Sequence, residues 1–306
     1  MTTVLSHEKR EVRVVDVPVT GSPKRGPLTR FVSNLGNGAV QVGLAVVAVF
    51  WLMPVFGLLV ASLRSEQANT ASGWWTIFTK PAELTLQNYA ELAGNETIWR
   101  SFLNTVYIAV PSTFLVVVIS ALAAYALAWI EFPGRDWLTV TVVGLLVMPI
   151  QVALIPVAKL FGALDLFGTI AGVVLFHVAF GLPFAVFLLR NFFTGIPVDL
   201  VEAARMDGAT EWVVFRRVIL PIAKPALASL TIFQFLWVWN DLLVALVFAD
   251  QDSAPITVAL RSQLRQFGAN IDLLSTGAFL SMAVPLVVFL AFQKYFVQGV
   301  LAGSTK

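Results

Sequence analysis

The sequence contains no cysteine and only two histidines, and it has few charged residues for its length of 306. The lack of cysteine excludes disulfides, thiolate nucleophiles and cysteine-based metal sites. His7 and His177 lie far apart in the chain, so a zinc site or a catalytic histidine cluster is not expected. Lysine and arginine form no basic run, and the net charge is only +2, which argues against nucleic-acid binding. We therefore predict no catalytic residues, no metal site and no nucleic-acid partner.

Charged residues make up 12% of the chain, whereas hydrophobic residues make up 58%, and the mean hydropathy is +0.82. A water-soluble fold of this composition would expose much apolar surface, which a lipid bilayer would instead cover. Transmembrane helices need roughly 20 apolar residues, and no segment shows the alternation of an outer-membrane barrel. Six segments qualify, at about 38–61, 103–129, 138–160, 170–190, 225–249 and 274–296. The sequence thus predicts an all-α fold, a polytopic membrane helical bundle with six transmembrane helices.

The positions of lysine and arginine predict the orientation of these helices. Residues 1–37 are polar and hold six basic residues, and we expect them to form a flexible cytoplasmic tail. The apolar run that follows is longer than the core of a signal peptide, so we expect a retained helix. With this orientation 14 basic residues lie inside and six outside, as the positive-inside rule requires. Both termini are then cytoplasmic.

Small residues and prolines within the spans indicate how the helices pack. Ser120 and Ala124 are four residues apart and form part of a small-residue ridge that lets helices approach closely. Pro149 and Pro156 in the third span, and Pro183 in the fourth, predict kinks or local unwinding. Such kinks suit a moving pathway and a static bundle equally well.

The long inner loop 191–221 has the signals of two short helices separated by a bend. Asp199 is a good N-cap, and Glu202 three residues later completes a variant capping box. The first helix is expected to run to about Asp207 and to stop at Gly208, which accepts a left-handed backbone. Thr210 is the expected cap of the second helix.

The first of these helices is too short to be stable alone in water, so it must lean on another surface. Ala203, Ala204 and Gly208 give it a low profile that lets a partner's backbone come close. Two interpretations remain equal on these features. The helix lies flat on its own membrane domain, or it docks against another protein.

The spacing in this loop resembles the EAA loop of ATP-binding-cassette (ABC) importer permeases. The family pattern has Glu-Ala-Ala, three residues, Gly, nine residues, Ile, one residue, and Leu-Pro. This chain matches it with Glu202-Ala203-Ala204, Gly208, Val218 in place of isoleucine, and Leu220-Pro221. Other stretches resemble the carbohydrate branch, specifically maltose-permease-G-like subunits. They are Thr85–Tyr89, Arg190–Phe193 with Ile196-Pro197, Trp239-Asn240-Asp241, Tyr295–Gly299 and Ala302-Gly303. The resemblance covers the chain from about residue 40 and leaves out the N-terminal tail.

This resemblance implies a type I ABC importer transmembrane-domain fold over residues 38–306, in a bacterial cytoplasmic (inner) membrane. It implies pairing with a second permease subunit, an ABC ATPase dimer below, and an extracytoplasmic solute-binding protein that delivers a sugar. The helix Glu202–Asp207 would be the coupling helix, with Glu202 facing a basic residue of the ATPase. The residues implied in coupling are Glu202, Ala203, Ala204, Asp207, Gly208, Phe215, Leu220 and Pro221. Since the chain has no Gly-Lys pair and hence no P-loop, ATP and Mg²⁺ are expected on the partner ATPase.

Few polar side chains lie within the predicted spans. Asp241 is the one acid well inside a span and is a functional candidate by default, although a hydrogen bond to Asn240 or a neighbouring helix is the favoured interpretation. Gln234, Trp239 and Asn240 are candidates for a translocation path, because amide and aromatic groups suit sugar hydroxyls. His177 is interpreted as an interhelix hydrogen-bonding residue.

Three alternatives remain. An importer permease for phosphate, amino acids or peptides would share the same loop. A secondary transporter would need coupling-ion carboxylates and an internal repeat, but the spans hold a single such acid and no evident repeat. A membrane-embedded enzyme would need a histidine, cysteine or paired-carboxylate constellation, which this sequence does not contain.

Overall fold

The computed structural model describes residues 27–267 and 271–304, and the elements in these ranges are helical apart from two isolated bridges, Arg64 to Leu84 and Gly168 to Ala249. The chain divides into two parts, Met1–Pro54 and Val55–Lys306. The first helix, α1 (Pro27–Ser62), starts inside the segment predicted as a tail, and residues 1–26 lie outside the described residues. The all-α prediction is confirmed.

Among the described residues, four helices contain a stretch long and apolar enough to cross a membrane, at the predicted first, second, fourth and sixth spans. All four begin earlier or end later than hydropathy alone suggests. The second starts where the Asn95 side chain accepts the Ile98 amide, 3.1 Å away, well before the predicted residue 103. These helices are α1, α4 (Glu96–Trp129), α7 (Ile170–Thr194) and α14 (Ile271–Ser304).

The third predicted span is two helices, α5 (Arg135–Leu146) and α6 (Ile150–Ala163), whose axes differ by 103°. The break falls at Pro149, the N-cap residue of α6. Proline has no amide hydrogen to donate and disfavours a helical residue before it, so the preceding helix must end. The kink or local unwinding predicted at Pro149 is confirmed, and the third predicted span corresponds to this bent pair of helices.

The fifth predicted span, 225–249, is also interrupted. α11 (Lys224–Trp239) ends at Asn240, and α12 (Leu243–Phe248) follows after a short break. Before α11, the helical stretch Glu211–Ile222 meets it at 76°. Counting each bent pair as one span, the described residues provide up to six crossings by length and composition.

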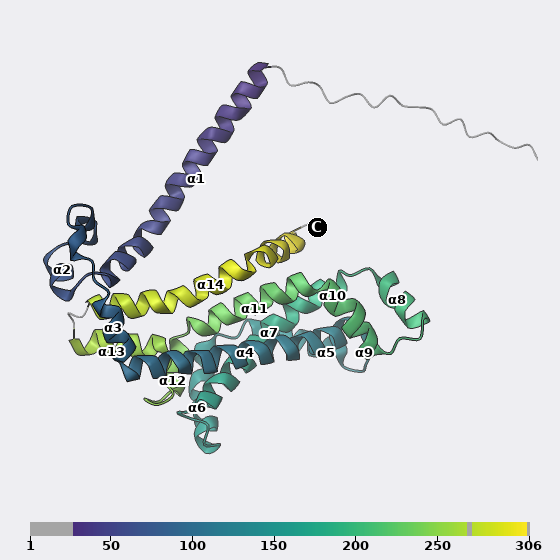
Figure 1. Ribbon diagram of the computed structural model, residues 1–306. Helices are drawn as coiled ribbons and strands as arrows, with labels where there is room; N and C mark the ends of the chain where they lie inside the picture. Colours follow the sequence, from purple (N-terminus) through teal and green to yellow (C-terminus); the bar gives the residue numbers. More distant parts are fainter. Residues whose placement is uncertain (1–26, 268–270, 305–306) are drawn as a thin grey trace, which may run out of the picture. The chain divides into compact units, whose positions relative to one another are not determined.

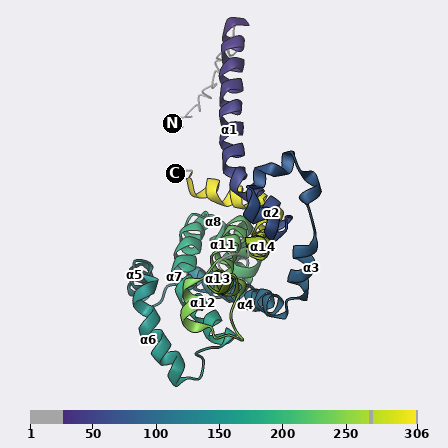
Figure 2. The ribbon, with the colours of Figure 1, turned by 90° about the vertical axis from the view of Figure 1, so that its left-hand side faces the viewer.

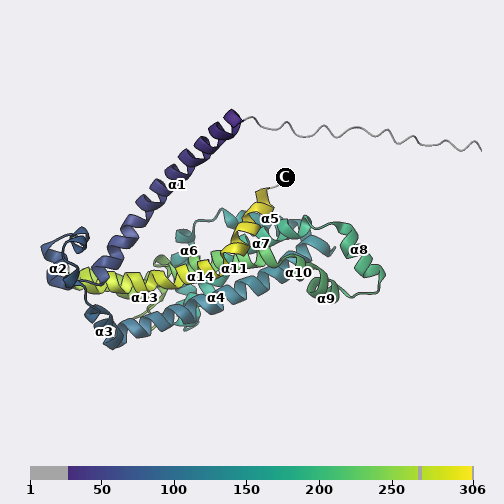
Figure 3. The same ribbon diagram turned by 45° about the horizontal axis from the view of Figure 1, so that its top comes forward.

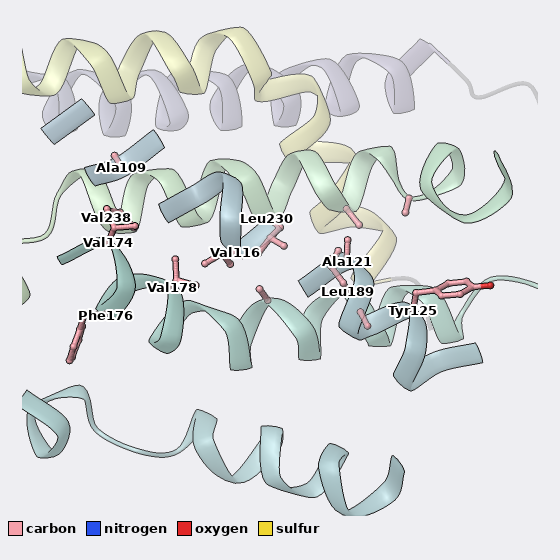
Figure 4. Packing of buried hydrophobic residues seen from close by; sticks show 14 of the residues in the cluster. Ala109, Val116, Ala121, Tyr125, Val174, Phe176, Val178, Leu189, Leu230 and Val238 are labelled. Carbon is pink, nitrogen blue, oxygen red and sulfur yellow. The ribbon is translucent and has the colours of Figure 1, made fainter. Parts of the chain in front are cut away.

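α4, α7 and α11 lie side by side and enclose the core of the second part, with α14 packed along α11 (Figures 1 and 3). Val116 of α4, Val178 of α7 and Leu230 of α11 converge at the centre of this core (Figure 4). Ser120 and Ala124 on the predicted small-residue ridge are fully buried, which brings the backbone of α4 close to its neighbours. Packing of apolar and small side chains thus fixes these three helices to one another.

The outside of the bundle is unusually apolar, and several polar side chains are buried inside it beside the apolar core. Ser112, Ser120 and His177 are fully buried, whereas Phe114 and Val140 are 65% and 61% exposed. Large apolar side chains on the outside and polar ones inside fit a protein surrounded by lipid. The chain is therefore a multi-pass membrane protein.

Short helices gather at the two ends of the bundle. At one end lie four short elements of the predicted outer loop, together with α13 (Figures 1 and 2). The buried Arg64 holds that loop, donating hydrogen bonds to the carbonyls of Ala68, Ser72 and Gly73 and an ion pair to Glu83 at 2.9 Å. The helices α8 (Val198–Met206) and α9 (Glu211–Val214) lie at the other end (Figure 1). The elements at the first end are α2 (Glu66–Ala71), η1 (Trp74–Phe78), η2 (Pro81–Glu83), α3 (Gln87–Gly94) and α13 (Ile256–Phe267).

Candidate functional site

The segment between α7 and α11 forms the helix–bend–helix expected from the sequence. Its first helix, α8, spans Val198–Met206. The prediction that Asp199 is its N-cap was wrong. The cap position is Pro197, and no side chain caps the helix end. The helix starts two residues earlier than predicted, because a proline with φ −55° and ψ 128° already points the chain into the first turn. Asp199 lies in that turn, where a carboxylate favours the positive end of the helix dipole.

The end of α8 is a Schellman turn centred on Gly208. Its φ is +82°, the left-handed region that glycine adopts without strain. The Gly208 amide donates to the Arg205 carbonyl at 3.0 Å, and the Ala209 amide donates to the Ala204 carbonyl at 3.1 Å. This pair of bonds defines the motif. The predicted stop at Gly208 is confirmed, and it turns the chain sharply before the next helix.

The second helix consists of α9 (Glu211–Val214), a π turn labelled η3 (Phe215–Ile219) and α10 (Leu220–Ile222). Thr210 occupies its N-cap position, as predicted, but makes no capping hydrogen bond with its side chain. The π turn ends two residues before Pro221, whose ring and missing amide hydrogen disturb a regular α turn. Phe215 and Ile219 in the π turn are buried and attach this helix to the bundle.

One face of α8 is anchored and the other is open. Val201 is fully buried, whereas Glu202, Ala203, Asp207 and Gly208 are exposed. The open surface also carries apolar side chains, of which Met206 is 88% exposed and Trp212 at the start of α9 is 59% exposed. α8 therefore rests on its own bundle and presents a surface to a partner, so the two interpretations left open above are compatible.

A cluster of four residues ties this segment to α4. Glu211 accepts a hydrogen bond from the Tyr125 hydroxyl at 2.6 Å. Arg205 donates to both carboxylate oxygens of Glu211, at 2.9 and 3.1 Å, and to the Trp129 carbonyl at 3.1 Å. The bond from Arg205 lowers the pKa of the Glu211 carboxyl below its ordinary value, and the same bond raises the pKa of Arg205. We call Tyr125, Trp129, Arg205 and Glu211 the α4 clasp. The sequence analysis missed it.

Two of the candidate path residues pack inside the bundle. Trp239 is 1% exposed, and its indole nitrogen donates to the Ser281 carbonyl of α14 at 3.0 Å. Gln234 is 4% exposed and lies against Gly181 of α7, where a Cβ would come within 2.7 Å of the Gln234 amide nitrogen. Gly181 thus makes the space in which the Gln234 amide sits between α7 and α11.

The other two candidates lie at the break between α11 and α12. Asn240 is exposed and donates back to the Leu236 carbonyl at 2.8 Å. The Asp241 carboxylate accepts the amides of Val244 and Ala245, so it caps the first turn of α12. Its partners are therefore the α12 backbone rather than Asn240.

The buried His177 of α7 faces this cap. Its Nε2 lies 3.6 Å from the Asp241 carboxylate, and its Nδ1 lies 2.8 Å from the Val173 carbonyl of its own helix. The predicted interhelix hydrogen bond of His177 is not formed: its hydrogen bond goes to its own helix, and Asp241 is the residue opposite its Nε2. Among the described residues no group of three or more histidines and acids could hold a metal ion.

The sequence of this chain is similar to those of known transport proteins. Residues 99–302 match the family described as "Binding-protein-dependent transport system inner membrane component". The osmoprotective compounds uptake permease protein GgtD of Synechocystis is 46% identical over 87% of this chain and 91% of its own length. The alpha-glucoside transport system permease protein AglG of Rhizobium meliloti is 49% identical over 79% of this chain and 66% of its own length. The trehalose transport system permease protein SugB of Mycobacterium tuberculosis is 33% identical over 87% of this chain and 94% of its own length.

A solved structure shares the fold. A chain of a bacterial ABC transporter involved in the import of alginate superposes with a TM-score of 0.74, covering 90% of this chain and 100% of its own. The sequence identity is 22%, so this likeness speaks for the fold alone. It confirms the transmembrane-domain architecture of an ABC importer.

Proposed function

Because the chain belongs to the family of inner-membrane components of binding-protein-dependent transport systems, we propose that it is the permease subunit of an ABC importer for a sugar or oligosaccharide. Members of this family are transport subunits rather than enzymes. The carbohydrate assignment is supported by relatives named for alpha-glucosides, trehalose and arabinooligosaccharides. The chain carries the solute path, and a separate ATPase supplies the energy.

The observation that carries this proposal is the exposed face of α8. Glu202 and Asp207 project from a short helix that is anchored on its other side by the buried Val201. The helix sits at the end of the bundle that the count of basic residues assigns to the cytoplasm, with both termini on the same side. We propose that an ATPase dimer, which holds ATP and Mg²⁺, receives this face in a cleft. A basic ATPase residue then pairs with Glu202.

Further partners complete the importer. A second permease subunit pairs with this chain, and an extracytoplasmic binding protein delivers the sugar to the opposite end. The bundle has interrupted helices at Pro149 and at Ala223, where helix segments meet at 103° and 76°. Such breaks let parts of the bundle rock between inward-facing and outward-facing arrangements as the ATPase closes.

The test of the carbohydrate assignment is uptake and stimulated ATP hydrolysis by the reconstituted importer in proteoliposomes. The α-glucosides maltose, trehalose and sucrose are compared with glycine betaine and phosphate, each with the binding protein present. We expect at least one sugar to stimulate hydrolysis and to accumulate. Stimulation by betaine or phosphate alone would make the chain a permease for a non-sugar solute. Uptake driven by an ion gradient without ATP would make it a secondary transporter.

The test of the ATPase surface is Glu202→Lys, with Asp199→Asn in the first turn of the same helix as the matched control. Both residues are exposed, so neither change should affect insertion into the membrane. Charge reversal at Glu202 should lower co-purification of the ATPase and lower uptake by about tenfold or more, the scale of a coupling free energy. Wild-type uptake by Glu202→Lys would contradict the proposed contact.

A further inference from the structure

The contacts of α8 with the bundle are few, which raises the question of how a push on this helix reaches the transmembrane helices. Only Val201 of α8 is fully buried. The turn after α8, from Asp207 to Gly208, is exposed. The chain itself connects α8 to α7 on one side and, through α9 and α10, to α11 on the other. Neither connection joins α8 directly to α4; the second meets α4 beyond the Gly208 turn, where Phe215 packs on Tyr125.

The α4 clasp supplies that third connection. Arg205 lies in the last turn of α8 and Glu211 is the first residue of α9, so the two residues stand on either side of the Gly208 turn. Both bind α4, Glu211 through the Tyr125 hydroxyl and Arg205 through the Trp129 carbonyl. The four residues close a ring across the turn and fasten both of its helices to one point on α4.

The chemistry of the ring suits the end of a helix. The last carbonyls of an α-helix have no partner within the helix and carry partial negative charge. The guanidinium of Arg205 donates to the Trp129 carbonyl, which carries part of this negative charge. Its other two hydrogen bonds go to the two oxygens of the Glu211 carboxylate, and this two-point contact fixes the orientation of the two side chains as well as their distance. The Tyr125 ring also packs on Phe215 at a centroid distance of 5.1 Å, so an apolar contact supports the polar ones.

The ion pair itself is half exposed, with side-chain exposures of 38% for Arg205 and 45% for Glu211. Ion pairs of this exposure add little to the stability of a fold. What the pair fixes is geometry: with it in place, α8 and α9 cannot turn relative to α4 without breaking several bonds at once. α4 in turn holds Val116 at the centre of the core, between α7 and α11 (Figure 4).

We infer that Arg205 and Glu211 are positioning residues that fasten the α8–α9 turn to Tyr125 and Trp129, so that movement of α8 is delivered to α4. This inference rests on the proposed function only for the source of the movement, the ATPase. The link to α4 is a property of this chain alone.

The link is tested by a distance measurement on the full-length protein. Because the chain has no cysteine, spin labels can be placed at Met206→Cys on α8 and Leu122→Cys on α4, both exposed. We expect a narrow distance distribution in the otherwise unchanged chain and a broader one after Glu211→Gln or Arg205→Gln. Glu131→Gln is the matched control, since Glu131 is exposed near the same end of α4 and makes no ion pair among the described residues. An unchanged distribution in Glu211→Gln and Arg205→Gln would overturn the link.

Delivery of movement is tested in the assembled importer by the ratio of sugar accumulated to ATP hydrolysed. Glu211→Gln should lower this ratio by about tenfold while ATPase binding and hydrolysis persist. Tyr125→Phe, which removes one of the two links, should have an intermediate effect, and Glu131→Gln should have none. A broadened distance distribution with an unchanged ratio would overturn the role in transmission. If the unaltered importer moves none of the sugars, the proposed function fails, whereas the distance measurement still decides the link.

Discussion

Gly208 has a φ of +82°, and a Cβ added there would meet no atom within 4 Å. The requirement for glycine at this position is therefore set by the backbone and not by crowding. An L residue in the left-handed region costs roughly 1–2 kcal/mol, and asparagine tolerates it better than most. The direction in which α9 leaves α8 depends on this one angle.

Substitutions at Gly208 should therefore rank by backbone preference. Gly208→Asn should keep most uptake, Gly208→Ala should lower it by several-fold, and Gly208→Pro should abolish it while the protein stays inserted. Proline fixes φ near −65° and removes the amide that bonds to the Arg205 carbonyl. Uptake in proteoliposomes, with membrane insertion as the control, measures this order. A bulky residue tolerated as well as asparagine would mean that the turn is not held at positive φ.

The Glu211 carboxyl gives a second prediction at this scale, on pH. Because its pKa is lowered by Arg205 below the ordinary 4.5, the clasp should be intact above that value and lost only as the pH falls through the lowered pKa. The distance distribution between labels on α8 and α4 should thus stay narrow from neutral pH down to the ordinary carboxyl range. In Arg205→Gln the carboxyl loses this support, so any residual Tyr125 bond should fail at higher pH. Broadening between pH 7 and 6 in the unaltered clasp would contradict this assignment.

Sequence alone reached part of this local geometry. A glycine nine residues after the predicted cap Asp199 was enough to place the stop at Gly208. The clasp was out of reach, because Tyr125 and Glu211 are 86 residues apart and no local pattern connects them. Asp199 was assigned as the cap on residue type, but the conformation of Pro197 had already started the helix.

At the scale of helices, hydropathy located the spans but not their bends. Hydropathy is summed along the chain and carries no direction, so 138–160 and 225–249 both read as single apolar runs. Pro149 located the first break, and only packing against neighbours sets its angle of 103°. The second break has no proline; it occurs where Asp241 takes the first amides of α12.

The cap at this second break can be tested directly. Asp241→Ala removes the acceptor for two amides and should lower the free energy of unfolding by about 1 kcal/mol, the usual loss of a helix cap. Asp241→Asn should keep most of it. Asn240→Ala is the matched control, since the Asn240 side chain bonds only to its own helix at Leu236. Thermal unfolding of the purified protein in detergent, followed by tryptophan fluorescence, measures the difference. Equal losses in Asp241→Ala and Asn240→Ala would remove the cap as the cause.

At the scale of the whole molecule, the two ends of the bundle carry different kinds of structure. One end has the loop folded around the buried Arg64, and the other has α8 with its open face. The distribution of basic residues assigns the α8 end to the cytoplasm and the Arg64 end to the outside. This orientation is a prediction from charge.

Labelling from one side of the membrane tests it. Met206→Cys on α8 and Phe78→Cys in the outer loop, each the single cysteine of its variant, are 88% and 74% exposed in the native residues. In sealed, right-side-out vesicles or whole cells a membrane-impermeant maleimide should label Phe78→Cys and not Met206→Cys. Inverted vesicles should give the opposite result. Reversal of both patterns would invert the proposed orientation.

The π turn before Pro221 has a consequence for how this segment tolerates change. Each residue of a helix advances the rotation by about 100°. A one-residue insertion or deletion between Gly208 and Pro221 would therefore rotate α9 by about that amount relative to α8 or to Pro221. Glu211 would then leave α4, and Trp212 would no longer lie on the open side. Side chains on the exposed face can vary, but the length of the interval cannot. The interval of thirteen residues from Gly208 to Pro221 therefore fixes the rotation of α9 about its axis. This accounts for a motif defined as much by spacing as by residue type.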